Sequence, residues 1–401
     1  MTSPNSSSRS MSFKDRFIDR VLAHIHIGYL TVTYPNGTTR HYGEETETLR
    51  AHLIFVDENA LTQIIRGGTM GFAEAYMNGV VQTDDLSALL TLLAQNLEDL
   101  RSRIDRNPIL TAMSRLIHIL RPNSRRGARR NIQAHYDLGN EFYAEWLDPS
   151  MTYSSARFTR KNQSLEKAQE QKYAAIARIA NLGAAHNVLE IGCGWGGFAE
   201  YAGHHIGCNL AGITISQEQF AYAQNRLRDS AAGNHASVHF QDYRDVTEKY
   251  DRVVSIEMFE AVGQKYWPVY FSKIRDVLKP GGKAALQIIT IHDQDFDRYS
   301  KGADFIQRYI FPGGMLPSLP KLREQFHMAE LREYACEHFG ADYARTLALW
   351  KKQFLEAWPK LSKMGFDERF KNMWCYYLSY CEAGFNTGSI DVVQIGLERP
   401  Q

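Results

Sequence analysis

The clearest pattern of hydrophobic and polar positions lies in the second half of the chain. Short apolar runs of strand length occur at 187–191, 209–216, 236–240, 251–263 and 283–291, and stretches of helical character separate them. Strands that alternate with helices indicate a parallel α/β sheet. A further apolar run at 390–398 predicts a last strand that returns to the same sheet.

The first hundred residues have a different pattern. Residues 12–100 read as a small mixed domain, with a hairpin turn at Asn36-Gly37 and a strongly helical stretch at 86–104. Residues 340–386 are also helical and carry a stripe of Trp, Phe and Tyr. Such a stripe is more often core packing than a cofactor contact.

The first strand of the predicted sheet runs directly into a glycine-rich turn, in the string NVLEIGCGWGG. Glycine allows a positive φ and a close approach of the backbone to a ligand, and the helix start behind it offers free N–H groups. The arrangement therefore predicts a nucleotide-like ligand at the carboxyl end of this strand.

The residues around the turn distinguish two ligands. A dinucleotide-binding domain has an acidic residue at the end of the second strand, but Thr214 and Ser216 occupy this place here. The GxGxGG spacing, with Glu190 just before it, suits S-adenosylmethionine instead. After the third strand, Asp242 is a candidate for the adenine amino group and Tyr243 for stacking on the ring; the alternative is a turn with a packed Tyr.

Composition excludes several classes of protein. The 401 residues carry a net charge of +1, are 44% hydrophobic, and contain no apolar run long enough to span a membrane. The start, 1–11, lacks a signal-peptide core and reads as a disordered tail. Five cysteines without paired spacing predict reduced thiols in a cytoplasm, and fourteen histidines without ligand spacing predict no metal.

Three further segments leave alternatives open. The basic stretch 106–134 is either a solvated linker or a phosphate-binding patch for a membrane surface, and no nucleic-acid-binding motif accompanies it. The aromatic stretch 135–158 is either a packed helical cap or a lid over a sulfonium. The insertion 292–327 is rich in apolar and aromatic residues, which suggests a hydrophobic substrate.

Seven strings along the chain carry a family resemblance. YDLGNEFY, MTYSSARF, LEIGCGWGG, GITISQEQ, QDYRD, SIEMFEAVG and DFIQRYIFPGGMLPS occur in order over about 135–320. Together they resemble the cyclopropane-fatty-acyl-phospholipid synthases and the mycolic-acid methyltransferases. GFAEAYMNGVVQTDDL, nearer the N-terminus, resembles the extra domain of the bacterial phospholipid enzymes.

The resemblance implies an S-adenosylmethionine-dependent methyltransferase fold, a Rossmann-like and mostly parallel sheet with a helical lid, and a smaller N-terminal α+β domain. It implies methyl transfer to the double bond of an unsaturated acyl chain. For catalysis it points to Glu260 and Tyr309, and to Cys381 at a position once proposed for a nucleophile; a buried thiol is the alternative for Cys381. The expected cofactor contacts are Tyr153, Ser154, Glu190, Gly192, Cys193, Gly194, Trp195, Gly196, Gly197, Thr214, Gln219, Asp242, Tyr243 and Arg244.

The family's base is thought to be a bound bicarbonate ion, and here the sequence departs from the pattern. Ser155 stands where many members have Cys, and Ile289 stands where they have His. Both positions line the family's bicarbonate site. A backbone N–H contact at Ser155 survives the change, whereas an imidazole contact at Ile289 does not. Methyl transfer is therefore better supported than ring closure.

The sequence predicts a tail at 1–11, a lipid-docking domain at 12–105, a basic linker or helix at 106–134 and a methyltransferase domain at 135–401. We expect a cytoplasmic enzyme, peripheral at the inner membrane surface, that acts on unsaturated phospholipid or acyl chains; a homodimer stays open. A cyclopropane is the favoured product. The alternatives are mid-chain methyl or methylene branching, a methyltransferase for a small isoprenoid or aromatic substrate, and a non-catalytic lipid-binding protein.

Overall fold

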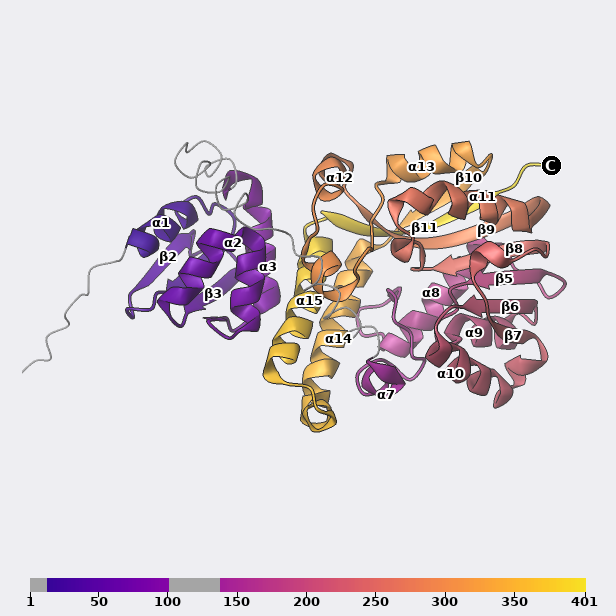
Figure 1. Cartoon of the computed structure of the whole chain (residues 1–401), viewed down its shortest axis with the longest axis horizontal. Helices are drawn as coiled ribbons and strands as arrows, with labels where there is room; N and C mark the ends of the chain where they lie inside the picture. The colour runs from indigo at the N-terminus through magenta and orange to yellow at the C-terminus, as the bar shows by residue number, and fades with distance from the viewer. Residues whose placement is uncertain (1–12, 101–137) are drawn as a thin grey trace, which may run out of the picture. The chain divides into compact units, whose positions relative to one another are not determined.

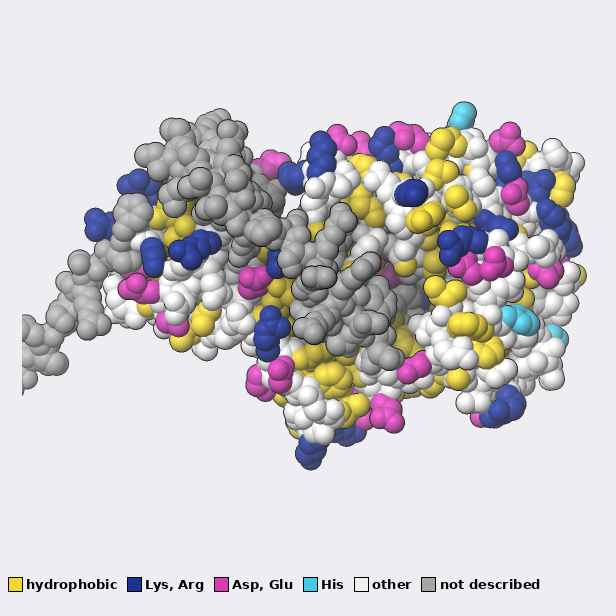
Figure 2. All heavy atoms as spheres, in the orientation of Figure 1, with side chains coloured by type: hydrophobic (Ala, Val, Ile, Leu, Met, Phe, Trp, Pro, Cys, Tyr) yellow, Lys and Arg dark blue, Asp and Glu magenta, His cyan; other side chains and the backbone are white. Residues whose placement is uncertain are grey.

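A computed structural model describes residues 13–100 and 138–401, which fall into two compact units (Figure 1). Residues 13–100 and 362–387 form the N-terminal unit, and residues 138–361 and 388–401 form the C-terminal unit. Charged side chains of both signs are interspersed on the face shown in Figure 2, in keeping with the net charge of +1. Within the described residues, no helix has both the length and the apolar character needed to cross a bilayer.

The N-terminal unit contains a four-stranded sheet in the order β2-β1-β3-β4. Its strands are β1 (Tyr29–Thr33), β2 (Thr39–Gly43), β3 (Arg50–Phe55) and β4 (Val81–Gln82). The predicted hairpin is present: β1 and β2 pair antiparallel, and Gly37 has φ +82° in the turn between them. The helices of this unit are α1 (Phe13–Leu22), α2 (Glu58–Met77), α3 (Leu86–Gln95) and α15 (Glu368–Asn386).

Helix α15 packs on helices of the N-terminal unit, although it lies within 135–401, the range that the sequence predicts as the methyltransferase domain. The Tyr376 ring packs on Phe72 and Tyr76 of α2, at centroid distances of 6.4 and 5.9 Å. Glu382 accepts a hydrogen bond from Ser87 of α3. An amphipathic face predicts burial but not the core in which it is buried, so the sequence did not reveal that α15 completes the N-terminal unit.

Asn96 joins the end of α3 to the segment before β1. Its Oδ1 accepts from the N–H groups of His26 (2.8 Å) and Ile27 (3.0 Å), and its Nδ2 donates to the carbonyls of Ile27 and Leu92 (2.8 Å each). The side chain is 1% exposed, so removing it leaves the partly buried N–H groups of His26 and Ile27 without this acceptor.

We expect Asn96→Ala to lower the free energy of unfolding of the N-terminal unit by about 1–3 kcal/mol, because partly buried backbone groups at two positions lose their hydrogen bonds to the side chain. Denaturant unfolding of the full chain measures this change. The control is Asn209→Ala, at an exposed asparagine of the C-terminal unit, which should shift the midpoint little. Equal midpoints for the two variants would contradict the role assigned to Asn96.

The C-terminal unit contains a seven-stranded sheet in the order β10-β11-β9-β8-β5-β6-β7. Strands β5 to β9 are parallel to one another, β11 pairs antiparallel with β9, and β10 pairs antiparallel with β11, so β11 alone in this sheet runs opposite to the other strands. The predicted mostly parallel α/β sheet is therefore confirmed, and β11 covers the predicted last strand. The strands are β5 (Asn187–Ile191), β6 (Asn209–Thr214), β7 (Ala236–Phe240), β8 (Tyr250–Ile256), β9 (Leu278–Ile291), β10 (Arg332–His338) and β11 (Ile390–Glu398).

Helices cover both faces of this sheet (Figure 1). Neighbouring strand residues point to opposite faces, so Leu189 joins the core that includes residues of α11 and α13, while Val188 joins the core that includes residues of α8, α9 and α10. The helices of this unit are α7 (Gly139–Ala144), α8 (Leu165–Ile179), α9 (Gly197–His205), α10 (Gln217–Arg228), α11 (Trp267–Val277), α12 (Asp293–Tyr299), α13 (Leu319–Met328) and α14 (Gly340–Leu361).

The order of the sheet fixes where a ligand binds. From β5 the chain continues outward to β6 and β7, and then returns to β8 on the other side of β5. Such a reversal opens a crevice at the carboxyl ends of the two diverging strands. The glycine-rich turn follows β5 at this point, and the string SIEMFEAVG begins within β8 and continues past its end.

Candidate active site

The glycine-rich turn after β5 is hydrogen-bonded to the end of β6. The N–H groups of Gly192 and Cys193 both donate to the carbonyl of Ile213 at 3.0 Å. Gly192 has φ +80°, and a Cβ at this position would lie 2.5 Å from Cγ of Met258. Only glycine fits there, because a side chain would meet both an unfavourable φ and a neighbouring residue. The turn is thus a backbone surface that a ligand can approach closely.

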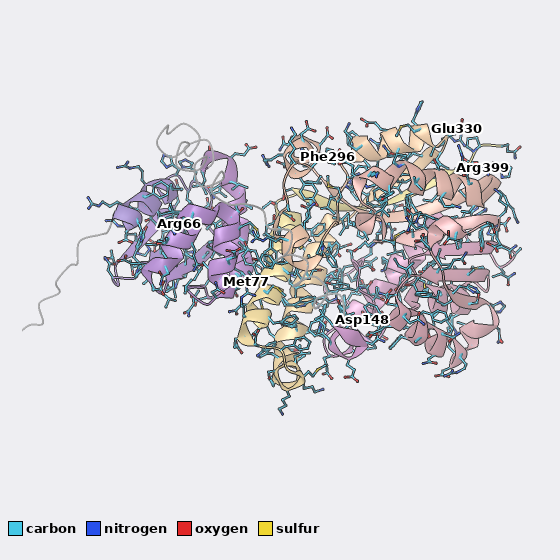
Figure 3. All side chains as sticks on the ribbon, in the orientation of Figure 1. Arg66, Met77, Asp148, Phe296, Glu330 and Arg399 are labelled. Atoms are coloured by element: carbon cyan, nitrogen blue, oxygen red, sulfur yellow. The ribbon has the colours of Figure 1, made fainter. Side chains whose placement is uncertain are left out.

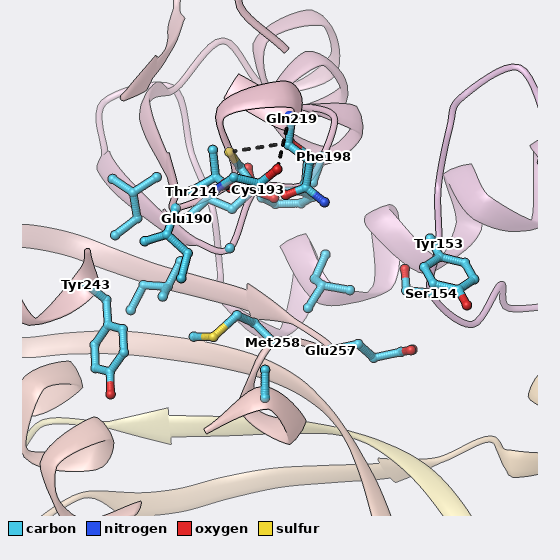
Figure 4. Close-up of a pocket in the computed structure, with 18 of the residues that line it drawn as sticks. Tyr153, Ser154, Glu190, Cys193, Phe198, Thr214, Gln219, Tyr243, Glu257 and Met258 are labelled. Carbon is cyan, nitrogen blue, oxygen red and sulfur yellow. Dashed lines mark hydrogen bonds between the residues drawn. The ribbon is translucent and has the colours of Figure 1, made fainter. Parts of the chain in front are cut away.

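A cavity of about 690 Å³ opens over this turn, a size typical of small-molecule sites. Figure 4 shows side chains from the ends of β5, β6 and β8 around it. Most of the predicted cofactor contacts line the cavity, namely Tyr153, Ser154, Glu190, Gly192, Cys193, Gly194, Trp195, Gly197, Thr214, Gln219, Asp242, Tyr243 and Arg244. The exception is Gly196, which packs against Ala223 of α10.

Glu190 is a buried acid at the end of β5. Its side chain is 2% exposed, and its Oε2 has no hydrogen-bond partner within the described residues. Burial raises the pKa of the carboxyl to about 8, and the nearby charge of Lys172 lowers it only in part. An unpartnered carboxylate oxygen in a cavity suits a ligand that brings a cationic group, such as the ammonium of S-adenosylmethionine.

Two polar pairs line the cavity after β6 and after β7. Thr214 Oγ1 donates to Gln219 Oε1 at 3.1 Å, as the dashed line in Figure 4 shows. Asp242 caps the turn after β7 and holds the Arg244 side chain through contacts of 2.9 and 2.6 Å. The carboxylate predicted to meet adenine is therefore already engaged with Arg244. Tyr243 packs edge-on against Tyr270, at 5.4 Å between ring centroids.

The aromatic stretch upstream of β5 forms a packed cap; its residues 135–137 lie outside the described residues. The Tyr153 ring contacts Tyr143, Trp146 and Trp350 at centroid distances of 5.2–5.8 Å. Asp148, labelled in Figure 3, follows α7 and accepts from the N–H of Ser150 at 2.9 Å. These contacts hold in place the segment that positions Tyr153 and Ser154 at the cavity.

Lys172 of α8 lies entirely in the interior beside this segment. Its Nζ donates to Ser154 Oγ at 2.6 Å and lies 4.3 Å from the centroid of the Tyr173 ring. Burial lowers its pKa to about 8, while the charges of Glu257, Asp148 and Glu190 oppose that change. Lys172 thus places a buried positive charge near the carboxylates of Glu257, Asp148 and Glu190.

Glu257 is a site residue that the sequence prediction missed. It follows β8, lines the cavity and has φ +48°, a conformation that costs a residue other than glycine about 1–3 kcal/mol. Its carboxylate accepts from the N–H of Ser155 (2.8 Å) and from the side chains of Gln287 and Tyr343 (2.6 Å each). An acidic residue at the carboxyl end of a parallel strand, beside a predicted catalytic acid, was the available signal.

Glu260 lies one turn further along, in a 3₁₀ helix at Phe259–Ala261. Its Oε1 accepts from the N–H of Ile289 at 2.6 Å, and its Oε2 is buried with no partner within the described residues. Burial, followed by the charge of Glu257, raises the pKa of Glu260 to about 8. Although Glu260 does not line the cavity, Ala261 and Val262 after it do.

The other two predicted catalytic residues also do not line the cavity. Tyr309 is buried in a π-helical turn, Ile306–Ile310, within the predicted lid insertion, and its ring packs on Phe305 at 5.2 Å. Cys381 lies on α15, which belongs to the N-terminal unit. Their catalytic roles remain predictions. Among residues 13–100 and 138–401, no three His, Cys, Asp or Glu side chains are grouped to hold a metal ion.

Comparison with known proteins identifies the family. The sequence profile of the mycolic acid cyclopropane synthetase family matches residues 123–395, more than half of the chain. The chain belongs to this family. It is an S-adenosylmethionine-dependent methyltransferase, as the glycine-rich turn and the unpartnered Glu190 indicate. Residues 17–102 match a second family, a domain of unknown function.

Two curated relatives align with this chain over most of their own length. A tuberculostearic acid methyltransferase of Mycobacterium tuberculosis, UfaA1, is 35% identical over 98% of this chain and 92% of its own. The cyclopropane-fatty-acyl-phospholipid synthase of Escherichia coli is 34% identical, over 84% of this chain and 85% of its own. A solved structure of the mycolic acid cyclopropane synthase CmaA1, in complex with SAH and CTAB, has 30% identity and a TM-score of 0.62, and covers 70% of this chain and 99% of its own.

Within this family the positions of Ser155 and Ile289 are of special interest, because the resemblance places bicarbonate beside them. In this chain the N–H of Ser155 donates to Glu257, and the N–H of Ile289 donates to Glu260. A free anion would therefore have to displace one of two carboxylates and lie beside the other. Like charges at such close range are unfavourable, so these residues do not fit bicarbonate.

The raised pKa of Glu190 predicts a pH dependence of cofactor-product binding. If the ligand's ammonium pairs with ionised Glu190, binding must release the proton that Glu190 holds below a pH of about 8. We expect the affinity for S-adenosylhomocysteine to rise with pH and to level off near 8. Calorimetric titration across this range measures it. Glu190→Gln should bind more weakly with a flat profile, and an unchanged slope in that variant would exclude Glu190 as the titrating group.

Proposed function

We propose that this methyltransferase acts on the double bond of an unsaturated acyl chain of a phospholipid and closes a cyclopropane ring. The observation that carries the proposal is the pairing of a cofactor cavity with two carboxylates, Glu257 and Glu260, at the end of β8. The names of the relatives support a lipid substrate: one is a cyclopropane-fatty-acyl-phospholipid synthase, and another was solved with CTAB.

The residues suit this chemistry. S-adenosylmethionine, when bound, supplies an electrophilic methyl group. Alkenes are weak nucleophiles, so alignment within a closed site contributes several kcal/mol, and the packed cap around Tyr153 helps to exclude water. A positive charge then develops on the acyl chain. Glu260, with an unpartnered and buried Oε2, is placed to stabilise it electrostatically.

Membrane contact belongs to the same proposal. The acyl chain of a phospholipid lies in a bilayer, so we propose that the N-terminal unit docks on the cytoplasmic membrane surface together with the basic segment 106–134, which lies outside the described residues. Co-sedimentation of the full chain with anionic phospholipid vesicles at low and high salt tests this. Binding that salt weakens is the expected result; absence of binding at low salt would favour a small-molecule substrate.

A second product has its own support. The match to a tuberculostearic acid methyltransferase covers 98% of this chain, and the string QIITI with Ile289 departs from the His-containing pattern. Methylation without ring closure would give a methylene branch, or a methyl branch if an outside reductant delivers hydride. A non-catalytic lipid-binding protein is disfavoured by the intact glycine-rich turn and by the two carboxylates of the site.

Mass spectrometry of membrane fatty acids separates these candidates. The chain is expressed in a host that has unsaturated lipids but no cyclopropane synthase, with an empty vector as the control. A gain of one CH2 unit that resists mild hydrogenation is the expected result. The same gain in a chain that still takes up hydrogen would establish the methylene product. A saturated chain with an added methyl group would establish the methyl branch, and unchanged chains would contradict the proposal.

A further inference from the structure

The carboxylate of Glu257 is held by donors from three separate parts of the chain. The N–H of Ser155 and Nε2 of Gln287 donate to its Oε1 at 2.8 and 2.6 Å, and the Tyr343 hydroxyl donates to its Oε2 at 2.6 Å. These groups come from the segment after α7, from β9 and from α14. A buried carboxylate that several donors satisfy in this way is held in one orientation.

The orientation of these donors is fixed by further hydrogen bonds. Gln394 of β11 donates to Gln287 Oε1 at 2.9 Å, and Arg157 donates to Gln394 at 3.1 Å. Because Gln287 accepts from Gln394, its amide nitrogen faces Glu257. The positive φ of Glu257 completes the arrangement, since the backbone turns at the end of β8 and the side chain lies at the cavity (Figure 4).

A carboxylate and a bicarbonate ion present the same chemistry to these donors. Both are planar and negatively charged, and both offer oxygen atoms that accept hydrogen bonds and protons. Of the two positions assigned to bicarbonate, Ser155 donates its backbone N–H to Glu257, and Ile289 offers no imidazole while its own N–H donates to Glu260. The chain therefore supplies from its own sequence the anion that the family pattern takes from solution.

We propose that Glu257 is the base of the reaction and that this enzyme needs no bicarbonate. The proposal rests on the proposed function. Methyl transfer forms a carbon–carbon bond, breaks the sulfur–methyl bond and leaves a cation on the acyl chain. A Glu257 oxygen then takes a proton from the transferred methyl carbon. The electrons of that C–H bond close the ring onto the cationic carbon, and Glu257 later releases the proton to solvent.

The surroundings of Glu257 suit a base that must be ionised yet able to accept a proton. Burial raises its pKa, while the hydrogen bond from Tyr343, the charge of Lys172 and the donors at Ser155 and Gln287 act in the opposite direction. Glu260 is the other carboxylate nearby, and its own pKa is raised in part by the charge of Glu257. Opposing influences of this kind tune a carboxylate towards the working pH.

Two variants of Glu257 test the proposal with the full chain, vesicles of unsaturated phospholipid and S-adenosylmethionine. Glu257→Gln keeps the shape but cannot accept the proton. Glu257→Gly removes the carboxylate, leaves space for an ion and relieves the positive φ, so it is expected to fold. The matched control is Glu330→Gly, which replaces an exposed glutamate at φ +56° (labelled in Figure 3) and should leave activity unchanged.

Rates are measured in buffer freed of carbon dioxide and again with added bicarbonate. We expect the wild-type enzyme to have the same rate in the two buffers. In the buffer freed of carbon dioxide, the rates of both Glu257 variants should be lower by about 10²–10⁴-fold. Added bicarbonate should restore Glu257→Gly at least tenfold and leave Glu257→Gln inactive. Strong stimulation of the wild type by bicarbonate, or near-normal turnover by Glu257→Gln, would overturn the proposal.

A binding measurement provides a readout that does not depend on activity. Line broadening of ¹³C-labelled bicarbonate in the NMR spectrum should occur with Glu257→Gly and not with the wild type. If the wild type also broadened the bicarbonate signal, and a competing anion reversed this broadening, the proposal would be overturned. A wild type that binds S-adenosylmethionine but methylates no lipid in either buffer would instead contradict the proposed function, so the two failures are distinguishable.

Discussion

Replacing Glu260 by glutamine is expected to lower kcat by about 10²–10³-fold, while the affinity for S-adenosylmethionine changes little. Glutamine keeps the oxygen that accepts from the N–H of Ile289, but it removes the negative charge. The pKa of Glu260, which burial raises to about 8, should fall when a positive charge develops nearby, because that charge favours the ionised form. The variant loses this stabilisation of the transition state.

The control for this prediction is Glu248→Gln, at an exposed glutamate before β8. Steady-state rates on lipid vesicles give kcat, and calorimetry gives cofactor affinity. If Glu260→Gln turned over at the wild-type rate, Glu260 would have no electrostatic role. A parallel loss of cofactor binding would instead mean that Glu260 supports the site structurally.

The second large effect is expected from Gly192→Ala, which should weaken S-adenosylmethionine binding about 100-fold. The new Cβ would lie 2.5 Å from Cγ and 2.8 Å from Cβ of Met258, so either the turn or Met258 has to move. A shift of about 1 Å in a positioning element can cost two orders of magnitude. Equilibrium binding of the cofactor measures the change directly.

Gly207→Ala is a matched control for Gly192→Ala. Gly207 follows α9 with φ +72°, and a Cβ there would meet no atom within 4 Å. Both variants have the same conformational cost of about 1–2 kcal/mol, and only Gly192→Ala adds a steric one at the cavity. Equal cofactor affinities for the two variants would show that the turn tolerates a side chain, and would contradict the requirement for glycine at Gly192.

The sheet and the cofactor turn could be predicted from sequence because their signals are local. Each strand is a short apolar run whose alternate residues, such as Val188 and Leu189, serve the two faces of the sheet. The turn needs glycine at Gly192 for reasons that involve its own φ and one neighbour. The resemblance to the family then supplied the cofactor, which the chain's membership confirms.

The environment of Glu257 could not be predicted, because it depends on distant parts of the chain. Its partners Ser155, Gln287 and Tyr343 are 102, 30 and 86 residues away in sequence. Nothing local marks a glutamate that adopts a positive φ. The partners of helix α15 could not be predicted for a related reason, since an aromatic stripe shows that a face is buried but not that Phe72 and Tyr76 cover it.

The most direct test of cyclopropane formation uses the purified chain, vesicles of unsaturated phospholipid and S-adenosylmethionine whose transferable methyl group carries three deuterium atoms. Mass spectrometry of the recovered acyl chains then counts the deuterium. We expect chains that gain one carbon, keep two of the three deuterium atoms and resist mild hydrogenation, because a base removes the third deuterium as the ring closes and no double bond is left. Retention of all three, or no label in any acyl chain, would contradict ring closure by this enzyme.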